Sequence, residues 1–203
     1  MSKRPIGVLL AAGRGRRMKR LKQLLPWPTS ESETTLVESS FDAIDMVCQQ
    51  MVVVLGDDAA EIQRALAPRT FAVARSDSDA EMFESVKCGL LAAQKIDRSS
   101  AIMLHPADHP HVRATTLETL LKERKQHRSQ AIVPTFNGRG GHPVLIPADL
   151  VRAILRSTSQ DGLKGVWRAN ESSVYRTAVD DQHVIYDLDT PEDTDWPTHA
   201  QNR

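Results

Sequence analysis

Short apolar runs alternate along this chain with longer segments in which apolar residues recur every three or four positions. The runs are typical of buried strands, and the longer segments are typical of helices with one apolar face. The predicted strands lie at residues 6–10, 51–55, 71–74, 101–104 and 131–133. Strands that alternate with helices form a sheet covered on both faces. We therefore predict a three-layer α/β/α Rossmann-like sandwich with a mostly parallel central sheet.

The second half of the chain adds shorter strands and a marked helix start. Asn137-Gly138 is a turn signal, so we expect a hairpin whose chain returns through residues 144–146. Thr115 and Glu118 have the spacing of a capping box, which predicts the first turn of a helix. Two late strands are predicted, at residues 174–179 and 184–186.

The composition suits one domain covering residues 1–203. The chain has 203 residues, 40% of them hydrophobic, and a formal net charge of zero. This balance does not suggest a coat for nucleic acid or a polybasic membrane anchor, so we expect neither partner. Cys48 and Cys88 show no metal or disulfide spacing, and we expect both to be small core residues in helices. These features predict a soluble cytoplasmic protein.

Positive charge gathers on a turn of small residues directly after the first predicted strand. Residues 11–13, Ala-Ala-Gly, leave backbone N–H groups uncovered, and Gly15 follows at once. Residues 1–30 carry eight basic side chains and no acidic one, whereas residues 180–195 carry seven acids and no Lys or Arg. Such a turn can surround a phosphate. The basic N-terminal segment and the acidic C-terminal segment therefore predict a site that binds phosphates and a metal together.

Two common phosphate motifs do not fit this turn. A Walker-type loop requires Gly-Lys followed by Ser or Thr at a set spacing, which Gly13, Gly15 and Lys22 do not provide. A dinucleotide fingerprint requires a small residue at the position of Met18. A solvated basic loop would explain the charges, but not their place on a glycine turn after a core strand.

The stretch Leu-Ala-Ala-Gly-x-Gly-x-Arg-Met, followed by Lys-Gln-Leu-Leu-Pro, resembles the signature of the MobA-like nucleotidyltransferases. Within that family it is most similar to the molybdenum cofactor cytidylyltransferase branch. The resemblance implies the fold of the nucleotide-diphospho-sugar transferases and a turn that holds a nucleoside triphosphate. The implied nucleotide-binding residues are Leu10, Ala11, Ala12, Gly13, Arg14, Gly15, Arg17 and Lys22. Arg17 and Lys22 would also be catalytic, because they would neutralise the phosphates.

Aspartates follow two other predicted strands. Mg²⁺ prefers oxygen ligands and usually takes one or two carboxylates together with substrate phosphates. Residues 108–110, Asp-His-Pro, match the family's central Asp-x-Pro motif, and residues 187–193 match its Asp-x-Asp-Thr-Pro-Glu-Asp motif. The match implies that Asp108 and Asp189 are ligands of a Mg²⁺ cofactor, with Asp108 also catalytic. Alternatively, Asp108 only caps a turn, while residues 190–193 are an ordinary helix start that leaves Asp189 free.

Five further residues lie in family motifs or beside them. Ser85 matches a Ser-x-x-x-Gly-Leu helix start whose Ser approaches the nucleobase, although a serine in a first helical turn needs no ligand. His142 lies in a Gly-His-Pro-Val hairpin that faces the acceptor in the family. His105, His109 and His111 have no zinc spacing, so we interpret them as ordinary loop histidines, one of which could tune the metal site or meet substrate.

The resemblance implies a nucleotidyltransferase that moves CMP from CTP onto a phosphorylated acceptor and releases pyrophosphate. Molybdopterin is the acceptor implied, with a molybdoenzyme or its chaperone as a further partner. A sugar-phosphate or alditol-phosphate nucleotidyltransferase is an alternative. A glycosyltransferase that shares this sheet and uses Asp187 and Asp189 with a nucleotide sugar is another. A nucleotide-binding regulator without turnover is the remaining alternative.

Overall fold

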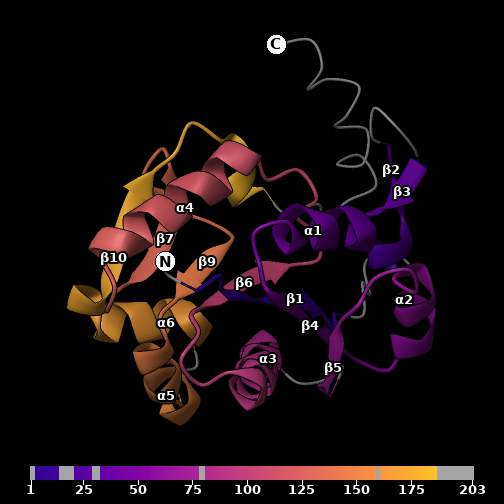
Figure 1. Cartoon of the computed structure of the whole chain (residues 1–203), viewed down its shortest axis with the longest axis horizontal. Coiled ribbons are helices and arrows are strands. Elements are labelled where there is room, and N and C mark those ends of the chain that lie inside the picture. Colours follow the sequence, from indigo (N-terminus) through magenta and orange to yellow (C-terminus); the bar gives the residue numbers. More distant parts are fainter. Residues whose placement is uncertain (1–2, 14–20, 29–32, 78–80, 159–160, 187–203) are drawn as a thin grey trace.

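The computed structural model describes residues 3–13, 21–28, 33–77, 81–158 and 161–186. An eight-stranded sheet runs through the middle of the molecule (Figure 1). Its strands are β1 (Ile6–Ala11), β4 (Gln50–Leu55), β5 (Ala72–Arg75), β6 (Ile102–Pro106), β7 (Ala131–Phe136), β8 (Arg139–Gly140), β9 (Val144–Ile146) and β10 (Val174–Ala178). They lie in the order β10-β7-β9-β6-β1-β4-β5, with β8 paired to β7.

Most neighbouring strands of this sheet are parallel. β1 pairs in parallel with both β4 and β6, and β4–β5 and β7–β10 are parallel as well. β9 is antiparallel to β6 and β7, and β8 is antiparallel to β7. The predicted mostly parallel sheet is confirmed. Because β1, β4, β5 and β6 run in the same direction, the loops after them leave from one edge.

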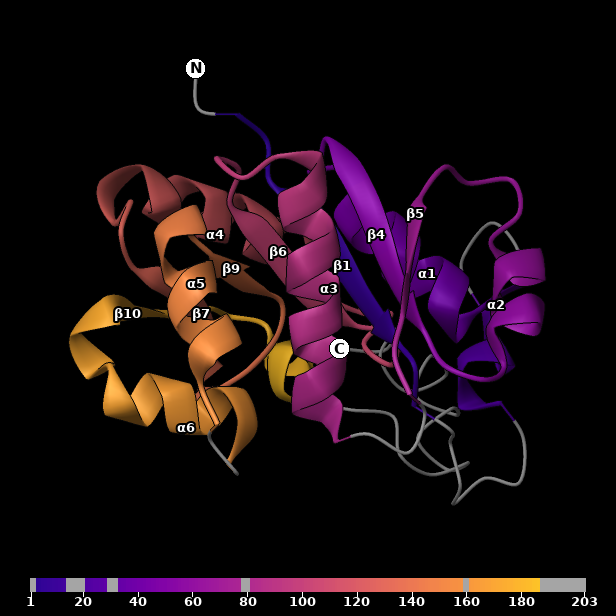
Figure 2. The same ribbon diagram turned by 90° about the horizontal axis from the view of Figure 1, so that it is seen from below.

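Helices cover both faces of the sheet, as the two views show (Figures 1 and 2). One face carries α1 (Leu36–Asp45), α2 (Ala59–Ala65) and α4 (Ala114–Gln126). The other carries α3 (Met82–Ile96), α5 (Ala148–Arg156) and α6 (Gly162–Ala169). Each face has its own apolar core, since side chains alternate along a strand. In β1, Val8 packs toward α3 while Leu9 packs toward α1.

Shorter elements connect and cover this framework. They are the 3₁₀ turns η2 (Lys22–Leu24), η3 (Glu171–Ser173) and η4 (Gln182–Ile185), and the small hairpin of β2 (Pro26–Pro28) and β3 (Glu33–Thr35). A capping box starts α1: Thr35 and Glu38 bond each other's backbone N–H groups, with distances of 3.4 and 2.9 Å. The hairpin therefore ends in a fixed helix start.

The predicted hairpin after β7 is confirmed. Asn137 and Gly138 both have positive φ, 49° and 76°, which is the backbone of a tight hairpin turn. The chain returns through β8, which pairs with residues 135 and 136, and then reaches β9. The peptide bond between His142 and Pro143 in this connection is cis.

Three local predictions were wrong. Residues 184–186 are not a strand: residues 182–185 form η4, because the Asp181 carboxylate accepts the His183 N–H and turns the chain. Thr115 and Glu118 form no capping box, since α4 begins at Ala114 after Arg113 and has no side-chain cap of its own. Cys48 is buried but lies beyond the end of α1. In the part of the chain described, no helix has the length and apolarity needed to cross a membrane.

Candidate active site

The loops after β1 and β6 start side by side. Leu10 is opposite Pro106 in the parallel register, and the Ala107 N–H donates to the Leu10 carbonyl over 3.0 Å. The turn of Ala11, Ala12 and Gly13 and the loop that carries Asp108 therefore leave from the same edge. This is the edge at which open α/β sheets bind ligands.

Lys22 reaches Asp108 across this edge. Its Nζ lies 3.0 Å from Asp108 Oδ2, although the residues are 86 positions apart in sequence. The Lys22 side chain is 10% exposed and the Asp108 side chain 28% exposed. Two of the predicted catalytic residues are thus brought together, in a place where water screens their charges only partly. The pair offers a cation and an anion to the same ligand.

Gln23 fixes η2 against the small-residue turn. Its Nε2 donates to the Gly13 carbonyl over 2.5 Å, and the side chain is buried. Its Oε1 has no hydrogen-bond partner among the residues that the structure describes. The bond holds Lys22, the preceding residue, beside the end of β1. Gln23 belongs to the Lys-Gln-Leu-Leu-Pro stretch, yet the sequence did not assign it a role.

Five histidines of the described residues form a cluster beside Asp108. The His109 ring lies 5.6 to 6.0 Å from its neighbours, measured between ring centroids, and its Nε2 lies 3.9 Å from Asp108 Oδ1. The cluster consists of His105, His109, His111, His142 and His183. The prediction of ordinary loop histidines is wrong for His105, which belongs to β6 and is fully buried.

Burial keeps rings of this cluster neutral. It lowers the pKa of His142 to about 4, with help from His109 and against Asp108. It lowers the pKa of His111 to about 3, with His183 and His109 acting in the same direction. The pKa of His105 is far below its usual value, first through burial and then through His109 and His142. At neutral pH these rings therefore add no positive charge that would oppose a cation beside Asp108.

His142 is held in place by η4. Its backbone N–H donates to the Val184 carbonyl over 2.7 Å, and the Gly141 N–H donates to the Pro134 carbonyl over 2.9 Å. A Cβ on Gly141 would clash with the Val184 carbonyl, so only glycine allows this approach. The His142 ring reaches His109, and its Nδ1 has no hydrogen-bond partner in the described part of the chain. The ring therefore lies close to the Asp108 loop.

Ser85 lies at the same edge of the sheet, beyond β5. Its Oγ is 2.9 Å from the Oγ of Ser76, the first residue after β5, and it is buried in the first turns of α3. Both predicted interpretations, a nucleobase contact and a helix-start serine, fit this position. Gly89 of the same motif has a packing role: a Cβ there would lie 2.5 Å from Val8 Cγ1.

Comparison with known proteins decides the family. The sequence model of the MobA-like NTP transferase domain matches residues 7–174. The chain belongs to the MobA-like NTP transferase family. Its enzymes are nucleotidyltransferases, and this chain is one of that type. The resemblance seen in the sequence is thereby confirmed.

Two relatives of this MobA-like chain have names that state different activities. The molybdenum cofactor cytidylyltransferase of Escherichia coli K12 is 25% identical over 189 residues, which is 92% of this chain and 91% of the relative. The nicotine blue oxidoreductase of Paenarthrobacter nicotinovorans is 31% identical over 195 residues, which is 92% of each chain. The match therefore covers nearly the whole length of both relatives.

Solved structures support the same fold. Rv0371c of Mycobacterium tuberculosis H37Rv is 27% identical, covers 95% of this chain and 96% of its own, and superposes with a TM-score of 0.77. A second structure of Rv0371c is a complex with manganese, at 26% identity, the same coverage and a TM-score of 0.71. The predicted α/β class and Rossmann-like layering are confirmed.

Several predicted site residues of the MobA-like motifs lie outside the described residues. They are Arg14, Gly15, Arg17 and Asp189. Asp108 is therefore the one predicted metal ligand whose position is known. Its carboxylate follows the end of β6 and is partly exposed, and its oxygen atoms suit a hard cation. Together with substrate phosphates, this donor fits Mg²⁺, which takes few protein ligands.

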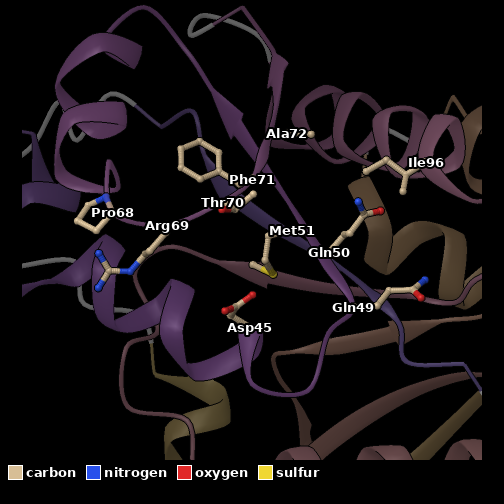
Figure 3. A pocket seen from close by; sticks show the side chains of 10 residues that line it. All are labelled: Asp45, Gln49, Gln50, Met51, Pro68, Arg69, Thr70, Phe71, Ala72 and Ile96. Carbon is tan, nitrogen blue, oxygen red and sulfur yellow. The ribbon is translucent and has the colours of Figure 1, made fainter.

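A separate pocket lies at the opposite edge of the sheet (Figure 3). Its volume is about 420 Å³, and its walls include Gln50 and Ala72, the first residues of β4 and β5. Asp45 and Met51 point into it. Arg69, in its wall, is held by Asp42 at 2.7 and 2.6 Å. Because Asp108 follows the end of a strand, this pocket is remote from the Lys22–Asp108 pair.

Proposed function

We propose that this MobA-like enzyme transfers CMP from CTP to a phosphorylated small molecule and releases pyrophosphate. The observation that carries the proposal is the contact between Lys22 and Asp108 at the carboxyl ends of β1 and β6. Separate segments supply a cation for phosphates and a carboxylate for a metal ion, beside a turn of small residues. Binding a free triphosphate requires these groups together.

The reaction needs no nucleophile from the protein. An oxygen of the acceptor phosphate attacks the α-phosphorus of CTP, a new P–O bond forms, and the bond to the β-phosphate oxygen breaks. Pyrophosphate leaves with that electron pair. Lys22 and Arg17 would neutralise the β- and γ-phosphates, and the backbone of residues 10–15 would hold the triphosphate. Catalysis then comes from positioning and charge neutralisation.

Asp108 and Asp189 would hold a divalent cation, for which we propose Mg²⁺. When bound, it would supply positive charge to the phosphates in the reaction. The manganese complex of Rv0371c supports a divalent metal in this fold. The neutral rings of His111 and His142 support it too, because they add no positive charge that would repel a cation beside Asp108.

Molybdopterin is the acceptor we propose, and a molybdoenzyme or its chaperone would then receive the product. The E. coli cytidylyltransferase, which is 25% identical, supports this choice. Ser85 would approach the nucleobase and His142 the acceptor, since both lie at the same edge of the sheet as Asp108. The free thiols of Cys48 and Cys88 suit the cytoplasm, the compartment we propose.

One observation favours a second candidate, an oxidoreductase. The nicotine blue oxidoreductase is 31% identical, which is higher than the value for the cytidylyltransferase. Against a nicotinamide cofactor on the first turn stands Met18, at the position where a dinucleotide fingerprint needs a small residue. A sugar phosphate or alditol phosphate remains the alternative acceptor for a nucleotidyl transfer.

The test follows isotopic labels from each of the four nucleoside triphosphates. The enzyme is incubated with Mg²⁺ and with molybdopterin, sugar phosphates or alditol phosphates. We expect the α-³²P label of CTP to move to molybdopterin and the γ-³²P label to appear in pyrophosphate. Transfer to a sugar phosphate or alditol phosphate would overturn the proposed acceptor but support the proposed reaction. Oxidation of a reduced nicotinamide without pyrophosphate release, or glycosyl transfer from a nucleotide sugar, would overturn the proposal.

A further inference from the structure

Two polar side chains are fully buried among apolar neighbours in their elements. Ser40 belongs to α1 and lies between buried residues of that helix, and His105 belongs to the core strand β6; both have 0% exposed surface. Burying a polar group is unfavourable unless hydrogen bonds replace those of water. Their partners therefore indicate what these side chains do.

Both side chains bond to the loop that carries Asp108. Ser40 Oγ donates to the Ala107 carbonyl over 2.9 Å. His105 Nε2 lies 3.0 Å from the His109 carbonyl. The accepting carbonyls thus belong to the residues directly before and directly after Asp108, and both bonds act on the same short stretch of backbone.

The hydrogen bond of His105 defines its tautomer. A carbonyl oxygen can only accept, so Nε2 must carry the proton. Burial keeps the ring neutral by lowering its pKa far below the usual value, and Nδ1 is then an unprotonated acceptor. Nδ1 has no hydrogen-bond partner among the described residues, which is unfavourable in a buried site. An apolar side chain of similar size would avoid this penalty but would remove the donor to the His109 carbonyl, so the bond to the loop is what the imidazole supplies here.

We propose that Ser40 and His105 are positioning residues that fix the backbone on both sides of Asp108 and so aim its carboxylate at the metal ion. This inference rests on the proposed function, in which Asp108 is a metal ligand. The Ala107 N–H bond to the Leu10 carbonyl adds a third restraint, which ties the loop to β1. Only the side-chain bonds of Ser40 and His105 can be removed by substitution without changing the loop itself.

The experiment measures Mn²⁺ binding to the free protein by electron paramagnetic resonance, and the Mg²⁺ concentration that gives half-maximal pyrophosphate release. The variants are Ser40→Ala, His105→Leu and His105→Gln. A displacement of about 1 Å can cost about 10²-fold in function. We expect Ser40→Ala and His105→Leu to raise both metal concentrations, the Mn²⁺ concentration for half-saturation and the Mg²⁺ concentration for half-maximal pyrophosphate release, at least about tenfold. His105→Gln, whose Nε2 can replace the imidazole donor, should return them to within about threefold of the parent.

Two control variants separate position from stability. Ser100→Ala removes another buried serine, just before β6 begins, whose Oγ donates to Asp97 over 2.9 Å. His127→Leu removes a ring that stacks on Tyr175 at the end of α4. Both lie away from the Asp108 loop. We expect them to change the unfolding midpoint but to leave both metal concentrations unchanged.

The outcomes distinguish this inference from the proposed function. If Asp108→Asn loses Mn²⁺ binding while Ser40→Ala and His105→Leu bind it as the parent does, the positioning role is overturned and the metal site stands. If Asp108→Asn also binds Mn²⁺ and turns over normally, the proposed function fails. Failure of His105→Gln to restore metal binding in a folded protein would overturn the role of His105. If His105→Leu does not fold, Ser40→Ala decides the result.

Discussion

At the scale of single residues, His111 carries a dependence on pH. Burial, together with His183 and His109, lowers its pKa in the folded protein to about 3. In an unfolded chain the same ring titrates near about 6.5. Below that pH the unfolded state binds a proton that the folded state does not bind until about pH 3. The folded protein therefore loses stability as pH falls through this window.

We predict that His111→Phe reduces this sensitivity to acid. One pKa unit corresponds to about 1.4 kcal/mol, so between pH 7 and pH 5 the partly buried ring should lower the parent's free energy of unfolding by about 2 kcal/mol. The variant keeps a ring in the same place and lacks this loss. Urea unfolding of both proteins at both pH values measures the difference. An equal loss in parent and variant would contradict the neutral state of His111.

The sequence predicted some residues of the site because strand ends determine them. Lys22 and Asp108 were both placed beyond strands that share an edge, and they meet there. The sequence predicts a loop at His105 because the expected strand 101–104 ends two residues before β6 does. The role of Ser40 depends on which side of α1 meets the loop after β6, and spacing along one helix does not show that.

At the scale of elements, α3 packs closely on the sheet at Gly89. A Cβ there would lie 2.5 Å from Val8 Cγ1 and 2.8 Å from Val54 Cγ2. We predict that Gly89→Ala lowers the free energy of unfolding by about 1–3 kcal/mol, although alanine favours a helix. Chemical denaturation measures the change. Lys95→Ala, on the exposed side of α3, is the control and should be nearly neutral. If Gly89→Ala instead raises the free energy of unfolding, α3 can move away from the sheet, which would contradict this prediction.

Asp181 ties the segment after β10 to the start of α4. Its Oδ2 accepts the Arg113 N–H over 3.0 Å and the Thr116 hydroxyl over 2.7 Å, and its Oδ1 accepts the His183 N–H over 3.1 Å. Burial raises the pKa of this carboxyl, but the His183 ring, whose Nδ1 lies 2.9 Å from Oδ1, and the hydrogen bonds from the Arg113 N–H and the Thr116 hydroxyl outweigh burial and lower the pKa to about 2. The stabilisation is complete above about pH 4 and is lost as pH falls toward about 2.

We predict that Asp181→Asn lowers the free energy of unfolding at pH 7 by about 2–3 kcal/mol. The amide has the same shape, but its NH₂ group would face donors that now bond to a charged oxygen. Asp180→Asn, at the exposed neighbouring residue, is the control, because the bond that Asp180 makes with Arg113 uses its backbone carbonyl and not its side chain. Urea unfolding compares the three proteins. Equal effects of the two substitutions would contradict the capping role of Asp181.

The same contacts explain which elements the sequence could not predict. Residues 184–186 have the apolar side chains of a strand, but Asp181 turns the chain before it can extend. The start of α4 is capped by a residue 68 positions beyond Arg113, so no nearby capping box is needed. A capping box does exist at Thr35 and Glu38, after the hairpin of β2 and β3. Local patterns predicted the type of most elements, while distant side chains determined several ends.

At the scale of the whole molecule, the alternation of strands and helices was enough to predict the layers. Parallel pairs around β1 follow from helical connections between strands. The hairpin predicts that β9 runs antiparallel to β7, but its place between β6 and β7 could not be read from the sequence, because a strand of three residues does not show which second strand it pairs with. The prediction that residues 1–203 form one domain stays a prediction.

The arrangement of the whole molecule brings segments 86 residues apart to one edge, and this convergence is the central claim. The most direct test is the rate of pyrophosphate release from CTP with Mg²⁺ and the acceptor that supports turnover, in the parent, in Asp108→Asn and in Asp149→Asn. Asp149 is an exposed aspartate in the first turn of α5 and serves as the control. We predict a loss on the order of 10²-fold or more for Asp108→Asn and a parent-like rate for Asp149→Asn. A parent-like rate in Asp108→Asn would contradict the account.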